Sequence, residues 1–201
     1  MKILAISCSP RADGNTVAML TEVLASAQLE GAEVELYSVA GKDIRPCDGC
    51  WTCIEAGRCH IEDDVGTLFE KMLAADGIVF GVPVYFHGMT AQAKAIIDRT
   101  ISLGAPERRL ANKVLGVVAS AGSLGLVQVL KDFTYYAHVK SMLPANHVAA
   151  YLGPQTGLEQ MPKCRQELRD LGRQMVALVK LGFQFPPEFV GRFTTFGTHT
   201  M

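Results

Sequence analysis

The sequence predicts an α/β fold in which helices cover both faces of a parallel sheet, and two observations support this prediction. Short apolar runs alternate with amphipathic segments along the chain, and three of the runs are apolar almost throughout. Strands of that kind belong to buried parallel sheets, because the crossover helices cover both sides. A chain of 201 residues is long enough for one such unit with a sizeable core.

Five strands are expected, at residues 2–8, 33–39, 77–82, 113–119 and 147–152. The expected helices lie at about residues 15–27, 63–73, 90–102, 124–142 and 160–180, where apolar residues recur with the helical period. Asn15 or Thr16 is expected to cap the first helix. The second begins with two acidic residues, Asp63 and Asp64, which suit the positive end of a helix dipole.

The charge balance excludes several classes of partner. Lysine and arginine number 19 against 20 aspartate and glutamate residues, so the formal net charge is −1. The sequence contains no basic run that would indicate binding to nucleic acid or to an anionic membrane. The uncharged stretch at residues 114–130 is too short and too interrupted by serine and glycine to span a membrane. The chain starts with a strand and not with a secretory leader, so we expect a cytoplasmic protein whose thiols stay reduced.

Four of the six cysteines lie within thirteen residues. Cys47, Cys50, Cys53 and Cys59 follow the spacing C-x2-C-x2-C-x5-C. Structural cysteines are scattered among core segments, whereas thiols so spaced can converge on one inorganic centre. The run resembles that of bacterial ferredoxins, except for a longer last spacer and the absence of proline after Cys59. It predicts an iron–sulfur cluster, [4Fe–4S] in the simplest case, with four thiolate ligands.

Other interpretations of the cysteine run stay open. A structural zinc ion also takes four thiolates, although zinc sites usually present two separated C-x2-C pairs. Disulfides are not expected in a reducing compartment, and a run of free thiols without metal is a further alternative. His60 could replace a cysteine ligand, but beside a complete thiolate set we expect it to be a bystander. Gly49 and Gly57 would let the backbone fold around a cluster.

The loops after three strands contain the remaining candidate site residues, because ligands of such sheets lie beyond the carboxyl ends of the strands. Residues 9–16 can surround a phosphate with hydroxyls, an amide, an arginine and helix N–H groups. Residues 83–88 offer a rigid turn and aromatic rings to a flat heteroaromatic group, and residues 120–122 are small and polar. A plain capped turn and core aromatics are the alternatives. The sequence contains no G-x-G-x-x-G or Walker motif. This argues against dinucleotide binding of the Rossmann kind and against P-loop chemistry.

Together these motifs resemble the iron–sulfur flavoproteins of the flavodoxin-like superfamily, which are relatives of the NADPH-dependent FMN reductases. The resemblance rests on the four-cysteine run with Asp63 and Asp64 behind it, on S-x-R-x-x-G-N-T at residues 9–16, on G-V-P-V-Y at residues 81–85 and on residues 94–99. It covers about residues 1–150.

This resemblance implies a flavodoxin-like three-layer sandwich with a five-stranded parallel sheet of order 2-1-3-4-5. It also implies FMN as prosthetic group and a [4Fe–4S] cluster on the four cysteines. The implied FMN-binding residues are Ser9, Arg11, Asn15 and Thr16 at the phosphate, Pro83, Val84, Tyr85 and Phe86 at the isoalloxazine, and Ser120, Ala121 and Gly122 on the far side of the ring.

The same resemblance implies a flavin-dependent oxidoreductase that forms a homodimer or homotetramer, in which cluster and flavin of neighbouring subunits approach. A cluster passes single electrons and FMN holds one or two. We therefore expect a ferredoxin-like electron donor and a small acceptor such as a quinone, O2 or peroxide. No catalytic acid–base pair is identified. Tyr85 and His87 lie near enough to the flavin loop to be proton-donor candidates, but a structural role is expected for both. The alternatives are an NAD(P)H-dependent FMN or quinone reductase without a cluster, and a non-enzymatic flavodoxin-like carrier or redox sensor.

Residues 183–201 are expected to form an aromatic arm after a single FMN-binding domain at residues 1–182, which contains the cysteine segment 47–59 as an insertion. The arm holds five of the nine phenylalanines, and its prolines and Gly191 prevent a helix. It could pack on its own subunit. Our hypothesis is that it reaches a neighbouring subunit and shields the cluster or the flavin.

Overall fold

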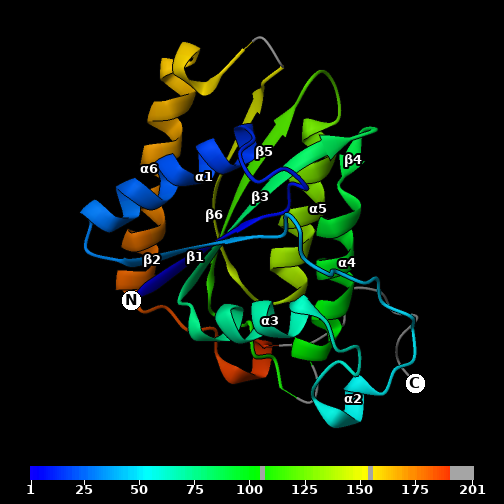
Figure 1. The fold of residues 1–201 in the computed structure, drawn as a ribbon. Coiled ribbons are helices and arrows are strands. Elements are labelled where there is room, and N and C mark those ends of the chain that lie inside the picture. Colours follow the sequence, from blue (N-terminus) through cyan, green and yellow to red (C-terminus); the bar gives the residue numbers. More distant parts are fainter. Residues whose placement is uncertain (105–106, 154–155, 191–201) are drawn as a thin grey trace.

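The computed structural model describes residues 1–104, 107–153 and 156–190. Five parallel strands form its central sheet in the order β2-β1-β3-β5-β6, which is the predicted order 2-1-3-4-5 when the parallel strands alone are counted (Figure 1). The strands are β1 (Lys2–Ser7), β2 (Glu33–Ser38), β3 (Gly77–Tyr85), β5 (Val114–Ala121) and β6 (Leu143–Tyr151). The predicted fold class is therefore confirmed.

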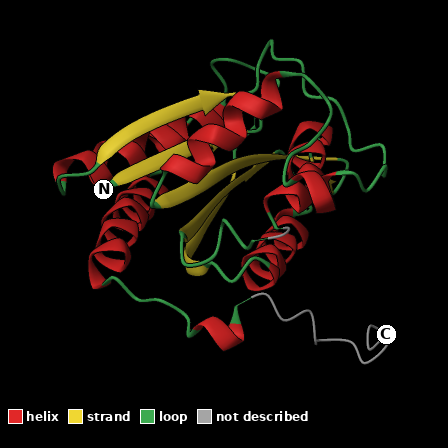
Figure 2. Ribbon diagram, turned by 90° about the horizontal axis from the view of Figure 1, so that it is seen from below, coloured by secondary structure: helices red, strands yellow, loops and turns green. Residues whose placement is uncertain are grey.

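Helices cover both faces of this sheet (Figures 1 and 2). Helices α1 (Asn15–Leu29) and α6 (Pro162–Leu181) pack on one face, against side chains such as Ile3 and Val79. Helices α3 (Asp64–Ala74), α4 (Ala91–Arg99) and α5 (Leu126–Val139) pack on the other. Successive residues of a strand point to opposite faces, so each strand contributes to both cores.

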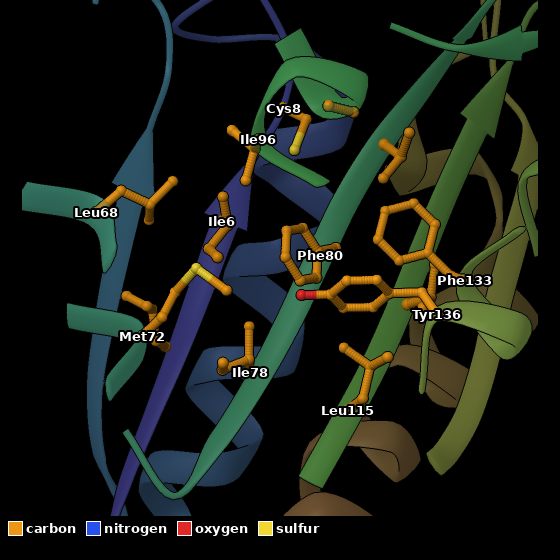
Figure 3. Close-up of a cluster of buried hydrophobic side chains, with 14 of the residues drawn as sticks. Ile6, Cys8, Leu68, Met72, Ile78, Phe80, Ile96, Leu115, Phe133 and Tyr136 are labelled. Carbon is orange, nitrogen blue, oxygen red and sulfur yellow. The ribbon is translucent and has the colours of Figure 1, made fainter. Parts of the chain in front are cut away.

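The core on the α3–α5 side is built around aromatic rings (Figure 3). The ring centroid of Phe80, on β3, lies 5.1 Å from that of Phe133 and 6.2 Å from that of Tyr136. Phe133 and Tyr136 are both on α5. Cys8 lies in the same core, where burial raises the pKa of its thiol to about 12. This buried thiol is packed as a small apolar side chain.

Several element boundaries differ from the prediction. Strand β3 continues through Pro83 to Tyr85 and folds back into the antiparallel strand β4 (Gly88–Met89), where a turn after residue 82 was expected. Pro83 is tolerated because its paired neighbour in the parallel sheet is on the β5 side, whereas the pairing with β1 ends at Gly81. Strand β6 begins at Leu143 and not at residue 147.

Helix boundaries differ too. The cap of α1 is the Gly14 backbone and not the side chain of Asn15 or Thr16, which are the first helical residues. Helix α5 is shorter than predicted at both ends. The helix predicted at residues 90–102 is divided into α4, which ends at Arg99, and the 3-10 helix η1 (Thr100–Leu103). The short helix α2 (Cys53–Ala56) and the 3-10 helices η2 (Leu158–Gln160) and η3 (Pro187–Phe189) were not predicted. As expected, Asp63 caps α3 by accepting a hydrogen bond from Val65 N at 3.1 Å.

The described part of the C-terminal arm begins on its own subunit. The Phe185 backbone N–H donates to Asn112 Oδ1 at 2.8 Å, and the Phe183 and Phe185 rings meet edge to face at 5.1 Å. Phe193 and Phe196 lie outside the described residues. Within the described ranges, no helix is long and apolar enough to cross a membrane.

Candidate functional site

The loop from β1 into α1 forms the first wall of the candidate site. The Arg11 backbone N–H donates to Ser9 Oγ at 3.1 Å, which folds the loop back on itself. The first turn of α1 follows, with the backbone carbonyl of Gly14 accepting from Val17 N and Ala18 N. A helix that starts here directs its N–H groups and the positive end of its dipole toward the loop, which favours an anion.

A pair of buried hydroxyls joins this loop to the neighbouring strand end. Thr16 Oγ1 and Ser120 Oγ lie 3.0 Å apart, and both residues are buried. Gly81 of β3 makes room for the start of α1, because a Cβ atom there would lie 2.6 Å from Leu20 Cδ1 and 2.8 Å from Thr16 Cγ2. The two loops are thus held in a fixed position above the carboxyl edge of the sheet.

Ten of the eleven predicted FMN-binding residues line one cavity of about 230 Å³ at this edge. They come from three loops or strand ends: Ser9, Arg11, Asn15 and Thr16; Pro83, Val84 and Tyr85; and Ser120, Ala121 and Gly122. Phe86 is the exception, since it does not line the cavity and is 99% exposed. The structure does not bring Phe86 into this cavity, because the chain reverses at Phe86 and His87 to form β4.

Three further residues line the cavity without having been predicted, namely Gly14, Leu152 and Gly153. Leu152 and Gly153 directly follow β6, whose carboxyl end lies at the same edge of the sheet as those of β1 and β5. A glycine after the last apolar strand was a signal that sequence reasoning could have used.

The wall formed by β3 and β4 ends in a strained two-residue turn. Phe86 and His87 both have positive φ, 46° and 67°, a conformation that favours glycine or asparagine. Gly125, at the start of α5, packs against this turn, because a Cβ atom there would lie 2.7 Å from His87 Cα. The backbone of the turn therefore packs against the start of α5, while the Phe86 side chain at its tip is exposed.

The cysteine segment forms a second candidate site between β2 and α3. Cys47 and Cys50 are exposed, Cys59 is half-buried, and Cys53 at the start of α2 is buried. Burial raises the pKa of the Cys53 thiol, and Cys59, Cys50 and Cys47 each raise it further. The other three cysteines of the run therefore affect the thiol of Cys53. Gly49 and Gly57 both adopt positive φ, as expected for a backbone that folds tightly around a centre.

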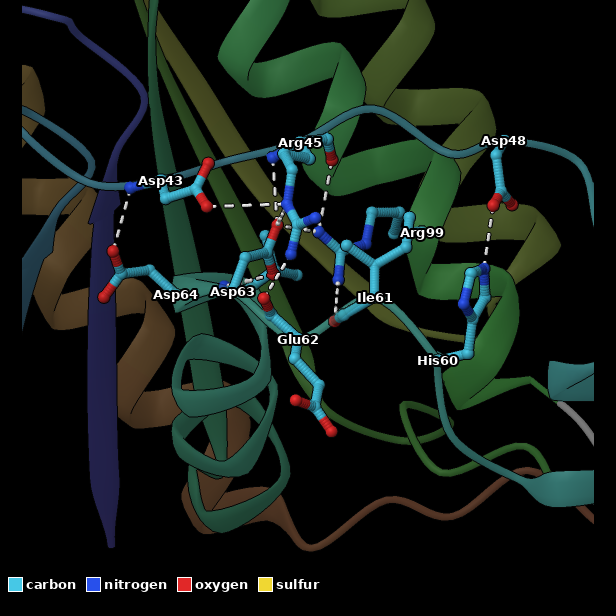
Figure 4. Close-up of polar contacts among 10 residues, drawn as sticks. Asp43, Arg45, Asp48, His60, Ile61, Glu62, Asp63, Asp64 and Arg99 are labelled. Atoms are coloured by element: carbon cyan, nitrogen blue, oxygen red, sulfur yellow. Dashed lines mark hydrogen bonds and ion pairs between the residues drawn. The ribbon is translucent and has the colours of Figure 1, made fainter.

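A hydrogen bond between two side chains joins the two ends of the cysteine segment. His60 Nε2 and Asp48 Oδ2 lie 2.8 Å apart and join the residues next to Cys59 and Cys47 (Figure 4). Asp48, Cys50 and His60 each place one potential ligand atom within 4.8 Å of the other two. Among the described residues, this is the group of three whose atoms lie close enough together to hold one metal ion. No three of the four thiols meet that criterion among the described residues. The C-x2-C-x2-C-x5-C spacing itself resembles that of cluster-binding runs more than the two separated C-x2-C pairs usual in zinc sites.

Basic side chains lie beneath the cysteine segment. Burial lowers the pKa of Lys140 to about 8, Arg108 lowers it further, and Cys53 opposes the shift. Lys140 Nζ donates to the carbonyl of Thr100 at 2.8 Å. Arg109 Nη2 donates to the carbonyls of Gly57 and Ser102, and its buried Nε has no hydrogen-bond partner among the described residues. These cations and unpaired donors suit a negatively charged thiolate centre.

Comparison with known proteins places the chain among flavoproteins. Residues 1–155 match the sequence model of the family described as NADPH-dependent FMN reductase. An iron–sulfur flavoprotein of Methanocaldococcus jannaschii is 38% identical over 90% of this chain and 98% of its own length. An iron–sulfur flavoprotein of Methanosarcina thermophila is 33% identical over 71% of this chain and 76% of its own.

Solved structures agree with the fold. A flavone reductase has a TM-score of 0.71 at 25% identity, covering 90% of this chain and 63% of its own. An NAD(P)H:quinone oxidoreductase from Methanothermobacter marburgensis has a TM-score of 0.64 at 15% identity, with 90% and 98% covered. The second likeness concerns the fold alone.

Proposed function

Because the chain belongs to the NADPH-dependent FMN reductase family, and within it to the iron–sulfur flavoproteins, we propose how this flavin-dependent oxidoreductase handles electrons. It passes them between a ferredoxin-like one-electron carrier, a [4Fe–4S] cluster on Cys47, Cys50, Cys53 and Cys59, and FMN. The final acceptor is a small molecule such as a quinone, O2 or peroxide.

The observation that carries the proposal is the presence of two distinct sites on one rigid scaffold. The cavity at the carboxyl edge of the sheet combines a helix start, hydroxyls and an arginine on one wall with backbone and rings on another. The cysteine segment carries four thiols, and Cys50 and Cys59 line a second cavity there. A bound cluster would exchange one electron at a time and FMN one or two, so together they would join one-electron to two-electron chemistry.

Within the cavity, each wall has its own proposed role. Ser9, Arg11, Asn15 and Thr16 bind the FMN phosphate, with Arg11 supplying charge and the start of α1 supplying N–H groups. Pro83, Val84 and Tyr85 lie along the isoalloxazine, and Ser120, Ala121 and Gly122 border its far side. Phe86 is not among the proposed flavin contacts, because it lies outside the cavity.

An exposed apolar surface around the cavity supports the proposal of a homodimer or homotetramer. Tyr85 and Phe86 are 47% and 99% exposed at the turn, and Leu124 and Val127, near the start of α5, are 62% and 69% exposed. Large apolar side chains grouped on one surface are typical of protein interfaces. Light scattering at several concentrations measures the assembly directly.

A second candidate function has support of its own. The matching family is described as NADPH-dependent, so an NAD(P)H-dependent FMN or quinone reductase without a cluster fits the same flavin cavity. Nicotinamide that stacks transiently on flavin needs no dinucleotide fingerprint. Rapid steady-state NAD(P)H oxidation by cluster-free protein would favour this candidate.

The deciding experiment is anaerobic purification with iron, acid-labile sulfide and flavin quantified on one sample. The proposal expects about four irons and four sulfides per FMN, the content of one [4Fe–4S] cluster. The same sample is then mixed with reduced ferredoxin or with NADPH under anaerobic conditions, and flavin reduction is followed by absorbance. Flavin without iron, reduced faster by NADPH than by ferredoxin, would replace the first proposal with the second.

A further inference from the structure

One buried arginine ties both ends of the cysteine segment to the body of the protein (Figure 4). Arg99, the last residue of α4, donates from Nη1 to the carbonyl of Arg45 at 3.1 Å. It donates from Nη2 to the carbonyl of Ile61, also at 3.1 Å. Arg45 precedes Cys47 and Ile61 follows Cys59, so a single guanidinium holds the segment where it begins and where it ends.

This guanidinium is inaccessible to solvent and incompletely paired. Its side chain is 1% exposed and forms an ion pair with Asp63, whose side chain is 0% exposed. Asp63 and the two carbonyls use the terminal nitrogens, while the buried Nε has no hydrogen-bond partner among the described residues. A buried donor without a partner is unfavourable, and in native proteins it often marks a contact with a bound group.

The sulfur of Cys59 is a candidate acceptor for this donor, because both residues line one cavity. Arg99, Arg109 and Cys59 line one cavity of about 440 Å³ between the cysteine segment, α3 and η1. The unpaired guanidinium N–H and this cysteine therefore border the same space.

We propose that Arg99 is a positioning residue for the cluster: it fixes the two ends of the cysteine segment, and its unpaired N–H donates to sulfur at the Cys59 side. This inference rests on the cluster of the proposed function. Reduction adds one electron to a centre that already carries four thiolates. A fixed cation and an N–H donor to sulfur stabilise the more negative state, so Arg99 should raise the reduction potential.

The test uses the full-length, cluster-loaded protein in four variants. Arg99→Gln removes both the positive charge and the planar set of N–H donors of the guanidinium. Arg99→Lys keeps the charge but loses that planar donor set. Arg109→Gln removes the neighbouring guanidinium that holds Gly57. Arg165→Gln is the matched control, because Arg165 also binds a carboxylate, that of Glu22, on the α1–α6 side of the sheet. Iron, sulfide and FMN are quantified, and the cluster potential is measured by an EPR-monitored dithionite titration.

Arg99→Gln should shift the reduction equilibrium of the cluster at least tenfold toward the oxidised form, which is about 59 mV for one electron. Arg99→Lys should fall between this variant and the wild type, and the flavin potential should be unchanged in both. If Arg99→Gln does not fold, as judged by loss of FMN, Arg99→Lys and Arg109→Gln must still lower the cluster potential relative to Arg165→Gln.

Wild-type cluster content and potential in the folded Arg99 variants would overturn the inference and leave Arg99 as a clamp of the fold alone. Absence of iron and sulfide from the wild type would instead overturn the proposed function. The two failures are therefore distinguishable in one set of samples.

Discussion

Asp63 and Arg99 form an ion pair that solvent does not reach, since their side chains are 0% and 1% exposed. The same carboxylate accepts hydrogen bonds from Arg45 N at 2.9 Å and from Val65 N at 3.1 Å. Asp63 therefore caps α3, holds the start of the cysteine segment and pairs with α4. Few side chains in the protein connect so many elements.

Replacing Asp63 with alanine should destabilise the protein by about 3–5 kcal/mol, because it leaves the buried guanidinium without its counter-ion. The measurement is urea unfolding followed by circular dichroism. Asp98→Ala is the control, because Asp98 pairs with Lys94 on the exposed side of α4 and its loss should cost about 1 kcal/mol or less. Equal effects in the two variants would contradict the importance of the buried pair.

The contribution of Asp63 should also depend on pH. Burial would raise the pKa of this carboxyl, but the Arg99 guanidinium and the backbone N–H groups of Arg45 and Val65 lower it below its ordinary value. A depressed folded pKa means that the stabilisation is present above the unfolded value of about 3.9 and is lost as the pH falls through the folded pKa. The stability difference between wild type and Asp63→Asn should thus shrink in unfolding titrations below about pH 4. A constant difference from neutral to acid pH would count against it.

Cys50→Ala and Cys53→Ala should each abolish iron and sulfide binding while FMN is retained, because the cysteine segment and the flavin cavity are lined by different residues. His60→Ala is the informative control. It removes the hydrogen bond to Asp48 but no thiolate, so its iron content should stay close to that of the wild type. Full iron content in both cysteine variants would contradict the assignment of these cysteines as cluster ligands.

Arg11→Ala and Asn15→Ala should weaken FMN binding and lower the melting temperature of the flavin-loaded protein. A ligand at a hundredfold excess over its Kd stabilises the folded state by about 2.7 kcal/mol, and weaker binding reduces this gain. Asp13→Ala, in the same loop but outside the cavity lining, should not weaken binding. Fluorescence titration with FMN measures all three, and unchanged affinity in the first two would show that the phosphate lies elsewhere.

Truncation after Lys180 should shift the protein to a smaller species in light scattering and make the cluster more oxygen-labile, if the aromatic arm fastens neighbouring subunits. A second truncation after Val190 keeps the described part of the arm, including the Phe185 contact with Asn112. Comparison of the two separates the role of the described part from that of residues 191–201. An unchanged assembly and cluster lifetime in both variants would show that the arm serves its own chain.

Much of the flavin cavity could be predicted because it follows from the topology. Parallel strands bring their carboxyl ends to one edge, so polar residues after the first, third and fourth predicted strands had to meet there. Phe86 does not line the cavity, because the strand continues past Pro83 to Tyr85 before the chain reverses, where the sequence suggested a turn. The residue at which a strand ends depends on how far the adjacent strands of the sheet continue to pair with it. This is a property of the tertiary structure and not of the local sequence.

The role of Arg99 was beyond sequence reasoning, although one signal for it existed. Arg99 lies three residues after Ile96, on the inward stripe of α4 that Ala95 and Ile96 also occupy. A charge on an apolar stripe requires a buried partner. The partner proved to be Asp63, 36 residues away along the chain, which only the packing of α4 against the start of α3 brings near.

The arginines that hold the cysteine segment bind main-chain carbonyls, those of Arg45, Ile61, Gly57 and Ser102. Every amino acid carries such a carbonyl, so this anchoring is indifferent to the identity of the side chains in the segment. Between its cysteines and glycines the segment can therefore change sequence over evolution while keeping its course. A designer could likewise exchange the intervening residues, to alter the surface offered to a redox partner, without dismantling the anchors.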